Sequence, residues 1–550
     1  MTVEAGNLVA KSAVDIAAAV EAGEVTARAV TDAALERISA INPKVNAFTD
    51  ILPIRARAKA DEIDSNRGNA SPGVLAGVPF AVKNLIDVAG IPTRAGSKIN
   101  RDLQPASRDA MLIRRFEAAG AVLVGALNMG EYAYDFTGEN IHDGPSRNPH
   151  ALDHMTGGSS GGSGAAVAAG LVPLALGSDT NGSIRVPSAL CGIFGLKPTF
   201  GRLSRAGSFP FVSSLDHLGP FARSVGDLAL AYDVLQGPDA DDPVSAQREA
   251  EPAFPMLETG YRGLRIAMAG GYFMSHAGPD ALEAVTAVAK ALGARKTVEI
   301  PEAARARAAA YVITAAEGAA LHLERLRTRA RDFDPAVRDR LIAGATIPAS
   351  WVIRAQRFRR WFYDRMLTLF ESVDVILAPV TPCRAPLIGQ TDFVLGGATM
   401  PIRPNMGIFT QPLSFIGLPV VAVPVWLDSG LPLGVQIIVA PWHEDRALRV
   451  ARALEQAGIV RAPVAALGDG EQQAGLPVLS RFPDSDKKVR RVLRKDSGVG
   501  AAGNRIHIER DRPSIRQVVR KGLERAECAL DGPRHRSLVQ FQQGRTQSRG

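Results

Sequence analysis

Residues 156–187 read TGGSSGGSGAAVAAGLVPLALGSDTNGSIRVP. Two turns rich in glycine and serine enclose an alanine-rich segment and a short apolar run, which predict a helix followed by a buried strand. Glycine lets the backbone of both turns adopt conformations that other residues avoid, so that main-chain N–H groups can converge on one point. A flexible Gly/Ser linker would not continue directly into residues 165–176, whose apolar pattern predicts burial. The stretch therefore predicts a structured functional site.

The second turn of this stretch contains the groups that acyl transfer requires. Such a reaction needs a nucleophile and several N–H donors directed at the oxyanion that forms on the attacked carbonyl. The hydroxyl of Ser183 is the candidate nucleophile. We predict an oxyanion hole formed by the backbone amides of Thr180, Asn181, Gly182 and Ser183.

Five segments resemble the amidase signature family. They are the Gly/Ser turn at 157–163, GSDTNGSIR at 177–185, CG at 191–192, GLKPT at 195–199 and GVPFAVKN at 77–84. The resemblance extends from about residue 10 to about residue 465. It implies the family's α/β fold, in which a mixed central β-sheet is flanked by helices. It also implies an amidase that needs no cofactor and no metal.

The segment at 77–84 places Lys83 in an otherwise apolar predicted strand. A lone lysine in such a position usually extends its ammonium group to solvent. In the family, however, the matching lysine is a base that acts through a bridging serine, which corresponds here to Ser159. Burial disfavours the ammonium form and lowers the pKa of a lysine. The resemblance therefore implies a proton route from Ser183 through Ser159 to Lys83, with a cis peptide bond before Ser159.

Within the family, several segments are similar to the 1-carboxybiuret hydrolase branch of biuret and cyanuric acid degradation. These segments are TNGS at 180–183, DHLGP at 216–220, KNL at 83–85, AGSKINR at 95–101, AQRFRR at 355–360 and PW at 441–442. The similarity implies hydrolysis of 1-carboxybiuret to urea-1,3-dicarboxylate and ammonia. It also suggests a small helical partner subunit, within a homo- or hetero-oligomer.

Alternative functions share some of these motifs. A general amidase, or the amidase subunit of a glutamine-dependent tRNA amidotransferase, would use the same serines and lysine, although Asn181 replaces the commoner glycine. Residues 157–161 also satisfy the G-x-S-x-G nucleophile elbow of α/β-hydrolases, with His443 as the late histidine. That pattern needs a strand directly before the elbow, and residues 153–156 make a poor one.

The composition excludes several other classes. The chain has 550 residues, of which 46% are hydrophobic and 22% charged, as in globular proteins with a large core. We expect neither a membrane span nor a signal peptide. Three widely spaced cysteines, Cys191, Cys383 and Cys528, favour a reducing, cytoplasmic compartment. His150 and His154 lie four residues apart but have no obvious third ligand, so we predict no metal site.

The remaining elements follow an α/β order. A helical segment is predicted over residues 8–65, with Ser12 and Thr26 as N-caps. Next come a strand at 73–88, a helix at 108–119 and a strand at 121–127. Later elements are strands at 373–379, 418–425 and 432–438, a loop at 384–413 that borders the pocket, and a helix at 445–457.

An α-rich insertion is predicted at about 257–375, ending in a helix at 353–370. Arg357, Arg359 and Arg360 in this helix are candidates for binding a substrate carboxylate, because a guanidinium group can donate two parallel hydrogen bonds to it.

Basic charge is concentrated at the C-terminal end. Residues 481–550 contain 18 Lys+Arg and 8 Asp+Glu, whereas the other 480 residues contain 46 and 48. We predict three parts: an N-terminal helical segment at 1–65, an amidase domain at 66–467 and a disordered basic tail at 468–550. The non-enzyme alternative is a scaffold that binds nucleic acid weakly, through the charge of this tail.

Overall fold

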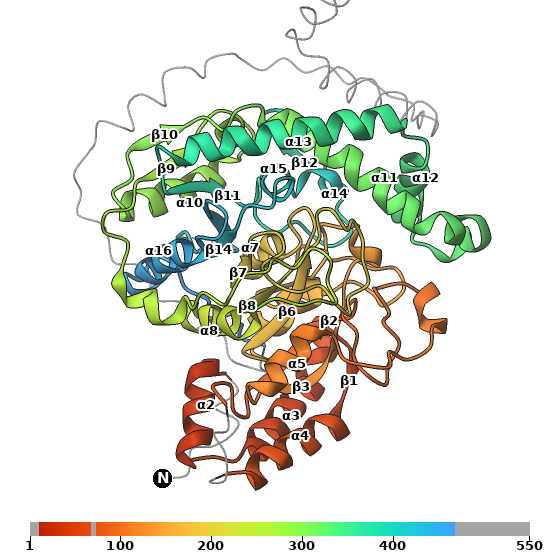
Figure 1. Ribbon diagram of the computed structural model, residues 1–550, viewed down its shortest axis with the longest axis vertical. Coiled ribbons are helices and arrows are strands. Elements are labelled where there is room, and N and C mark those ends of the chain that lie inside the picture. Colours follow the sequence, from red (N-terminus) through yellow and green to blue (C-terminus); the bar gives the residue numbers. More distant parts are fainter. Residues whose placement is uncertain (1–9, 68–72, 429, 468–550) are drawn as a thin grey trace, which may run out of the picture. The chain divides into compact units, whose positions relative to one another are not determined.

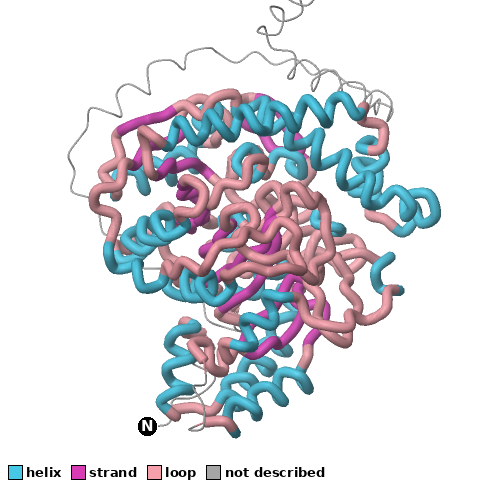
Figure 2. Tube along the Cα trace, viewed as in Figure 1, coloured by secondary structure: helices cyan, strands magenta, loops and turns pink. Residues whose placement is uncertain are grey.

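A mixed β-sheet of eleven strands organises the fold (Figures 1 and 2). The computed structural model describes residues 10–67, 73–428 and 430–467, which belong to one compact unit, Met1–Leu467. Within these residues the strand order is β1-β3-β2-β6-β8-β7-β14-β15-β11-β9-β10. The predicted basic tail lies outside the described residues. The sheet confirms the α/β fold class.

Three parallel strands at one side of the sheet position the first turn and Lys83. β2 (Pro79–Lys83) lies between β3 (Val122–Leu127) and β6 (Leu174–Asp179), and all three are buried along their whole length. Helices on both faces of a parallel sheet explain why such strands are continuously apolar. Because parallel strands end at the same edge, Lys83 at the end of β2 lies beside the end of β6, where the second turn begins.

The remaining strands are mostly antiparallel. β6 pairs with β8, and the sheet continues through β7, β14, β15 and β11. Their bounds are β1 Phe48–Ile51, β7 Phe194–Lys197, β8 His217–Ala222, β9 Ile266–Ala269, β10 Lys296–Val298, β11 Val375–Pro379, β14 Val420–Val425 and β15 Leu433–Val439. Two further ribbons pair β4 (Arg147–Asn148) with β5 (Ala151–Met155), and β12 (Asp392–Leu395) with β13 (Ala398–Pro401).

Helices cover the sheet, and a separate group, α11 to α13, packs mainly on itself (Figure 1). The α-helices are α2 Ala13–Ala22, α3 Ala27–Val45, α4 Pro53–Ser65, α5 Met111–Ala118, α6 Gly161–Ala168, α7 Arg185–Cys191, α8 Val225–Leu235, α9 Tyr272–Ser275, α10 Pro279–Ala291, α11 Ala303–Arg329, α12 Pro335–Gly344, α13 Ala349–Phe370, α14 Ile402–Asn405, α15 Gln411–Ser414 and α16 Glu444–Gln456. Short 3₁₀ turns are η1 Ile99–Asp102, η2 Glu131–Ala133, η3 Phe254–Thr259 and η4 Ala330–Asp332. In the described part of the chain, no helix is long and apolar enough to cross a membrane.

The predicted N-terminal helical segment contains a strand. Ser12 and Thr26 cap α2 and α3 as expected, each accepting a backbone N–H at 3.0 Å. The helical pattern was expected to continue, but α3 ends at Val45, and its C-cap Asn46 has a left-handed backbone (φ +49°). The next residues form β1, which pairs with β3. Pairing with a distant strand overrides the local helical pattern here.

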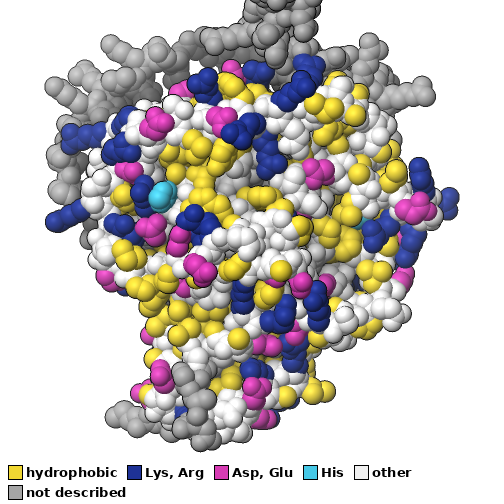
Figure 3. All heavy atoms as spheres, viewed as in Figure 1, with side chains coloured by type: hydrophobic (Ala, Val, Ile, Leu, Met, Phe, Trp, Pro, Cys, Tyr) yellow, Lys and Arg dark blue, Asp and Glu magenta, His cyan; other side chains and the backbone are white. Residues whose placement is uncertain are grey.

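The region predicted as an α-rich insertion also contributes to the sheet. Helices α9 to α13 lie in it, but so do β9 and β10, which join the sheet beside β11 in parallel. Strands of three or four residues carry too little periodicity to be recognised in the sequence. On the face shown in Figure 3, basic and acidic side chains are interspersed among hydrophobic ones.

Candidate active site

Lys83 is fully buried and contacts two serines. Its Nζ lies 2.6 Å from Oγ of Ser159 and 2.8 Å from Oγ of Ser178. Burial lowers the pKa of Lys83 to about 7, although Asp179, Asp216 and Asp135 act to raise it. A lysine with this pKa is substantially unprotonated near neutral pH, so its amine can accept a proton.

Ser159 lies in the first turn, directly before α6. The peptide bond between Gly158 and Ser159 is cis, as the family resemblance implies. The backbone N–H of Gly130 donates to the carbonyl oxygen of Ser159 at 3.1 Å. A Cβ atom on Gly158 would lie 2.3 Å from Oδ2 of Asp135, so only glycine fits at this position.

Ser183 lies in the second turn and lines a cavity of about 20 Å³. The four backbone N–H groups from Thr180 to Ser183 donate to no protein atom among the described residues. Gly182 has φ +145°, and a Cβ atom there would lie 2.1 Å from Oγ1 of Thr410. The turn thus combines a pocket-facing serine with unpaired amides. No hydrogen bond joins the side chains of Ser159 and Ser183 within the part of the chain that the structure describes.

A buried ion pair holds both ends of the second turn. Asp179, at the end of β6, accepts hydrogen bonds from the backbone N–H of Ile184 at 3.2 Å and from Nε and Nη2 of Arg185, each at 3.0 Å. Burial alone would raise the pKa of Asp179, but the Arg185 guanidinium holds it well below its usual range. Arg185 also donates to the carbonyl oxygen of Thr410 at 3.1 Å and to Gln436 at 2.8 Å.

Asp216 connects the turn to the loop before β8. Thr180 Oγ1 donates to Oδ1 of Asp216 at 2.6 Å, and the backbone N–H groups of Phe211 and Val212 donate to Oδ2 at 2.9 and 3.0 Å. Burial raises the pKa of Asp216. Because Phe211 also lines the cavity, this carboxyl group fixes the second turn and one wall of the cavity together.

The cavity has polar groups on its far walls. Arg340, from α12, lines it, donates to the carbonyl oxygen of Tyr134 and lies 3.8 Å from the centre of the Tyr134 ring. No carboxylate of the described residues forms an ion pair with Arg340. Asn181 donates to Thr314 Oγ1 at 3.0 Å, whereas its Oδ1 has no partner among the described residues. The pocket thus offers a cation for an anionic group and an acceptor for an N–H group.

The arginines proposed from the sequence lie elsewhere. Arg360 is 80% exposed and pairs with Asp364, and Arg359 donates to the carbonyl oxygen of Ser214 at 2.8 Å. Neither these residues nor Arg357 line the cavity beside Ser183. Arg340 occupies that position instead, because α12 rather than α13 reaches the pocket.

Sequence reasoning did not single out Ser178, Asp179, Asp216 or Arg340. Ser178 and Asp179 had a detectable signal, since these polar residues stand at the end of the apolar run predicted to form a buried strand. Asp216 belongs to the DHLGP segment at 216–220, which carries only the family resemblance. Arg340 had none, because it follows a surface-like helical pattern. A strand does precede the G-x-S-x-G turn, because β5 ends at Met155, so the expectation that residues 153–156 make a poor strand was wrong. The α/β-hydrolase alternative still gains no support, because Ser159 contacts a lysine and His443 lines a separate cavity. Within the described residues, no group of three His, Cys, Asp or Glu side chains could hold a metal.

The chain is similar to known proteins in sequence and in fold. The family model described as Amidase matches residues 29–448. AtzE, the 1-carboxybiuret hydrolase subunit of Pseudomonas sp. (strain ADP), is 54% identical over 452 residues, which are 82% of this chain and 99% of that protein. The A-type subunit of the Glutamyl-tRNA(Gln) amidotransferase of Roseiflexus castenholzii (strain DSM 13941 / HLO8) is 39% identical over 465 residues, 79% of this chain and 93% of that protein.

A solved structure is similar over the same region. It is described in the words "An unexpected vestigial protein complex reveals the evolutionary origins of an s-triazine catabolic enzyme". Its TM-score is 0.81 at 53% sequence identity, and the match covers 82% of this chain and 100% of that one.

Proposed function

This chain belongs to the amidase signature family of amide-bond hydrolases, and from that premise we propose that it hydrolyses 1-carboxybiuret to urea-1,3-dicarboxylate and ammonia. The observations that carry the proposal are the buried hydrogen bond between Lys83 and Ser159 and a cavity lined by Ser183 and Arg340, an arginine with no carboxylate partner among the described residues. The 54% identity to a 1-carboxybiuret hydrolase subunit supports the choice of substrate.

The residues suggest a Ser-Ser-Lys mechanism. The neutral amine of Lys83 accepts the proton of Ser159 while Ser159 takes the proton of Ser183, whose oxygen attacks the terminal carbonyl carbon. The free amides of residues 180–183 stabilise the oxyanion. Ser159 then returns a proton to the leaving nitrogen, and ammonia departs. Water attacks the remaining carbamoyl-enzyme by the reverse proton route and releases the dicarboxylate.

Arg340 and Asn181 supply the substrate contacts in this proposal. A guanidinium without a carboxylate partner is suited to bind the carboxylate of 1-carboxybiuret through charge-assisted hydrogen bonds. The unpartnered Oδ1 of Asn181 accepts an N–H of the ureido chain. Biuret lacks the carboxylate and would lose the first of these contacts.

Ammonia release by the purified chain tests the proposal. Wild type, Ser183→Ala and Lys83→Ala are compared on freshly generated 1-carboxybiuret, biuret, glutamine and an aliphatic amide. We expect turnover of 1-carboxybiuret to exceed that of the other amides, and both variants to lose at least ~10³-fold in kcat. Preference for glutamine would instead favour the amidotransferase function of the relatives that are 36–39% identical. Full activity of Lys83→Ala would exclude the lysine mechanism.

The proposal includes a partner. One solved relative is described as a protein complex, and we extend this to a small helical subunit for the present chain. Copurification from the native host, followed by mass spectrometry, tests it, and recovery of this chain alone would count against it.

A further inference from the structure

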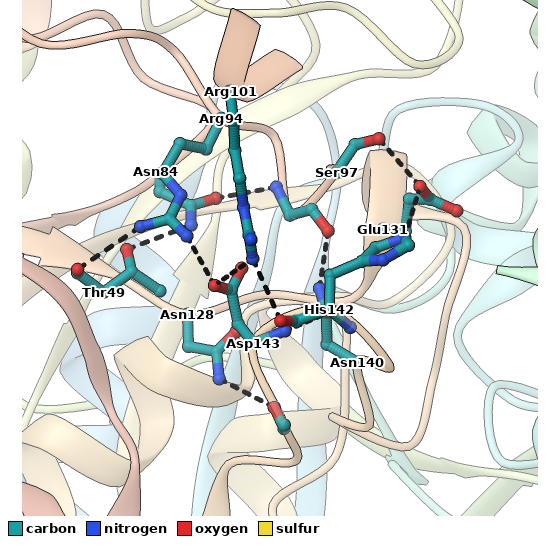
Figure 4. Close-up of polar contacts among 12 residues, drawn as sticks. Thr49, Asn84, Arg94, Ser97, Arg101, Asn128, Glu131, Asn140, His142 and Asp143 are labelled. Carbon is teal, nitrogen blue, oxygen red and sulfur yellow. Dashed lines mark hydrogen bonds and ion pairs between the residues drawn. The ribbon is translucent and has the colours of Figure 1, made fainter. Parts of the chain in front are cut away.

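A buried hydrogen-bond network surrounds the loop that follows Lys83 (Figure 4). Asn84, the next residue, accepts the backbone N–H of Gly96 at 3.0 Å and donates to Thr49 Oγ1 at 3.1 Å. The carbonyl oxygen of Gly96 in turn accepts from Asn140 at 2.7 Å. These contacts fix the loop at residues 95–97 against the end of β2, where Lys83 lies.

Glu131 connects this network to another part of the molecule. It is 1% exposed, and both of its carboxylate oxygens are used. Oε1 accepts from Ser97 Oγ at 2.7 Å and lies 2.9 Å from Nε2 of His142 (Figure 4), whereas Oε2 accepts the backbone N–H of Asp334 at 2.7 Å. A buried carboxylate without hydrogen-bond donors is energetically costly. Glu131 therefore favours the conformation in which Ser97 and the backbone N–H of Asp334 both stay within hydrogen-bond distance.

Asp334 is the N-cap of α12, the helix that carries Arg340. Its side chain accepts the N–H of Ala336 at 2.8 Å, which closes the first turn. Further along α12, Arg340 donates to the carbonyl oxygen of Tyr134.

Two contacts therefore join the segment 131–134 to helix α12. One runs from the backbone N–H of Asp334 to Glu131, and the other from Arg340 to the carbonyl oxygen of Tyr134. The helix cannot slide along the segment without breaking either the Glu131 contact or the Tyr134 contact. The residues that follow Glu131, from Ala133 to Phe136, line the cavity beside Ser183. Movement of α12 would thus displace the Arg340 guanidinium relative to the reacting serine.

We propose that Glu131 is a positioning residue that holds α12 in register with the pocket, so that Arg340 meets the substrate carboxylate. Glu131 touches neither substrate nor the reacting serines and acts through Arg340. The inference rests on the proposed function, because it assumes an anionic substrate. It predicts a defect that depends on the substrate's charge, which a general loss of stability would not produce.

The test compares Glu131→Gln with Arg340→Ala on 1-carboxybiuret and on biuret. Glutamine keeps the shape of the side chain but removes its charge. Its oxygen can still accept the N–H of Asp334 and its NH2 can donate to the Ser97 hydroxyl, so both hydrogen bonds lose their charge assistance and are weakened. We expect KM for 1-carboxybiuret to rise ~10-fold in Glu131→Gln and more in Arg340→Ala, with kcat and the kinetics on biuret changed less than ~2-fold. The KM of the double variant for 1-carboxybiuret should not exceed that of Arg340→Ala, because both changes act on the same interaction between Arg340 and the substrate carboxylate.

Lys98→Ala is the matched control. Lys98 belongs to the same loop and forms an exposed ion pair with Asp332 at 3.0 Å, two residues before Asp334. Its loss should leave the kinetics on both substrates unchanged. If Glu131→Gln does not fold, Ser97→Ala replaces it, since this change removes one donor to Glu131, and we expect KM for 1-carboxybiuret alone to rise ~3-fold.

Each outcome decides the inference. The inference is overturned if Glu131→Gln loses equally on both substrates. It is also overturned if the KM effects of Glu131→Gln and Arg340→Ala add fully in the double variant. Where Ser97→Ala replaces Glu131→Gln, an unchanged KM for 1-carboxybiuret overturns it. If wild type shows no preference for the carboxylate substrate, the proposed function fails instead. A preference that Arg340→Ala removes and Glu131→Gln retains overturns the positioning role alone.

Discussion

Two lysines among the residues that the structure describes, Lys83 and Lys197, are fully buried, and their surroundings differ. Lys197 donates to the carbonyl oxygen of Pro198 at 3.0 Å and contacts no serine, whereas Lys83 contacts Ser159 and Ser178. Burial lowers the pKa of both. A low pKa alone therefore does not distinguish a base, and the contact with Ser159 supports the proposal that Lys83 is the base. Ser178 keeps the amine directed at Ser159 by occupying one of its N–H groups.

The pH dependence of activity follows from Lys83. The amine must be unprotonated to accept a proton, and its pKa is lowered to about 7. We expect kcat/KM to fall about tenfold per pH unit on the acidic side of that value and to level off above it. A pH profile of ammonia release, with protein stability checked at each pH, measures this. A profile flat from pH 5 to 9 would contradict the role of Lys83 as base.

At the scale of elements, the second turn depends on an ion pair more than on the helix that follows it. Helix α7 has seven residues and no side-chain N-cap. The Asp179–Arg185 pair closes the turn instead, and Arg185 is fully buried. Removing one member leaves the other charge buried without its partner, which is far less favourable than losing an exposed pair.

Asp179→Asn is expected to destabilise the fold by about 3–5 kcal/mol, because Arg185 would remain buried without a counter-charge. Thermal unfolding measures this change, and activity should fall with it, since Ile184 and the turn lose their anchor. Asp364→Asn, which breaks the exposed pair with Arg360, is the control and should leave the melting temperature nearly unchanged. Similar melting temperatures for the two variants would contradict the structural role of the buried pair.

Elements with long, regular patterns could be predicted from the sequence. The strand expected at 121–127 is β3, and the helix expected at 445–457 is α16. The short strands β1, β9 and β10 could not, because each is stabilised by pairing with a strand distant in sequence. The hairpin of β12 and β13 likewise lay within an expected loop.

At the scale of the whole molecule, every group assigned to the site belongs to the unit Met1–Leu467. This unit contains the helices and strands from α2 to α16. Lys44 of α3 donates to the carbonyl oxygen of Leu467, the last residue of the unit. The basic residues that follow Leu467 lie outside the described residues and are known here from the sequence.

A chain truncated after Leu467 is expected to keep kcat/KM within about twofold of the full chain, because no described contact of the site would be removed. The same pair of proteins tests the predicted tail. Salt-sensitive binding of duplex DNA by the full chain, absent from the truncated one, would support nucleic-acid binding by charge. Loss of amidase activity on truncation would show that the unit is incomplete without the last residues.

The sequence by itself determined the family, the fold class and the candidates Ser183, Ser159 and Lys83, because each lies in a contiguous motif whose local chemistry is readable. Only the tertiary structure decided which distant groups meet. Lys83 and Ser159 are 76 residues apart, and Glu131 and Asp334 are 203 apart. Such contacts depend on the packing of eleven strands and of α12 against the pocket, and packing is a property of the whole chain rather than of any segment.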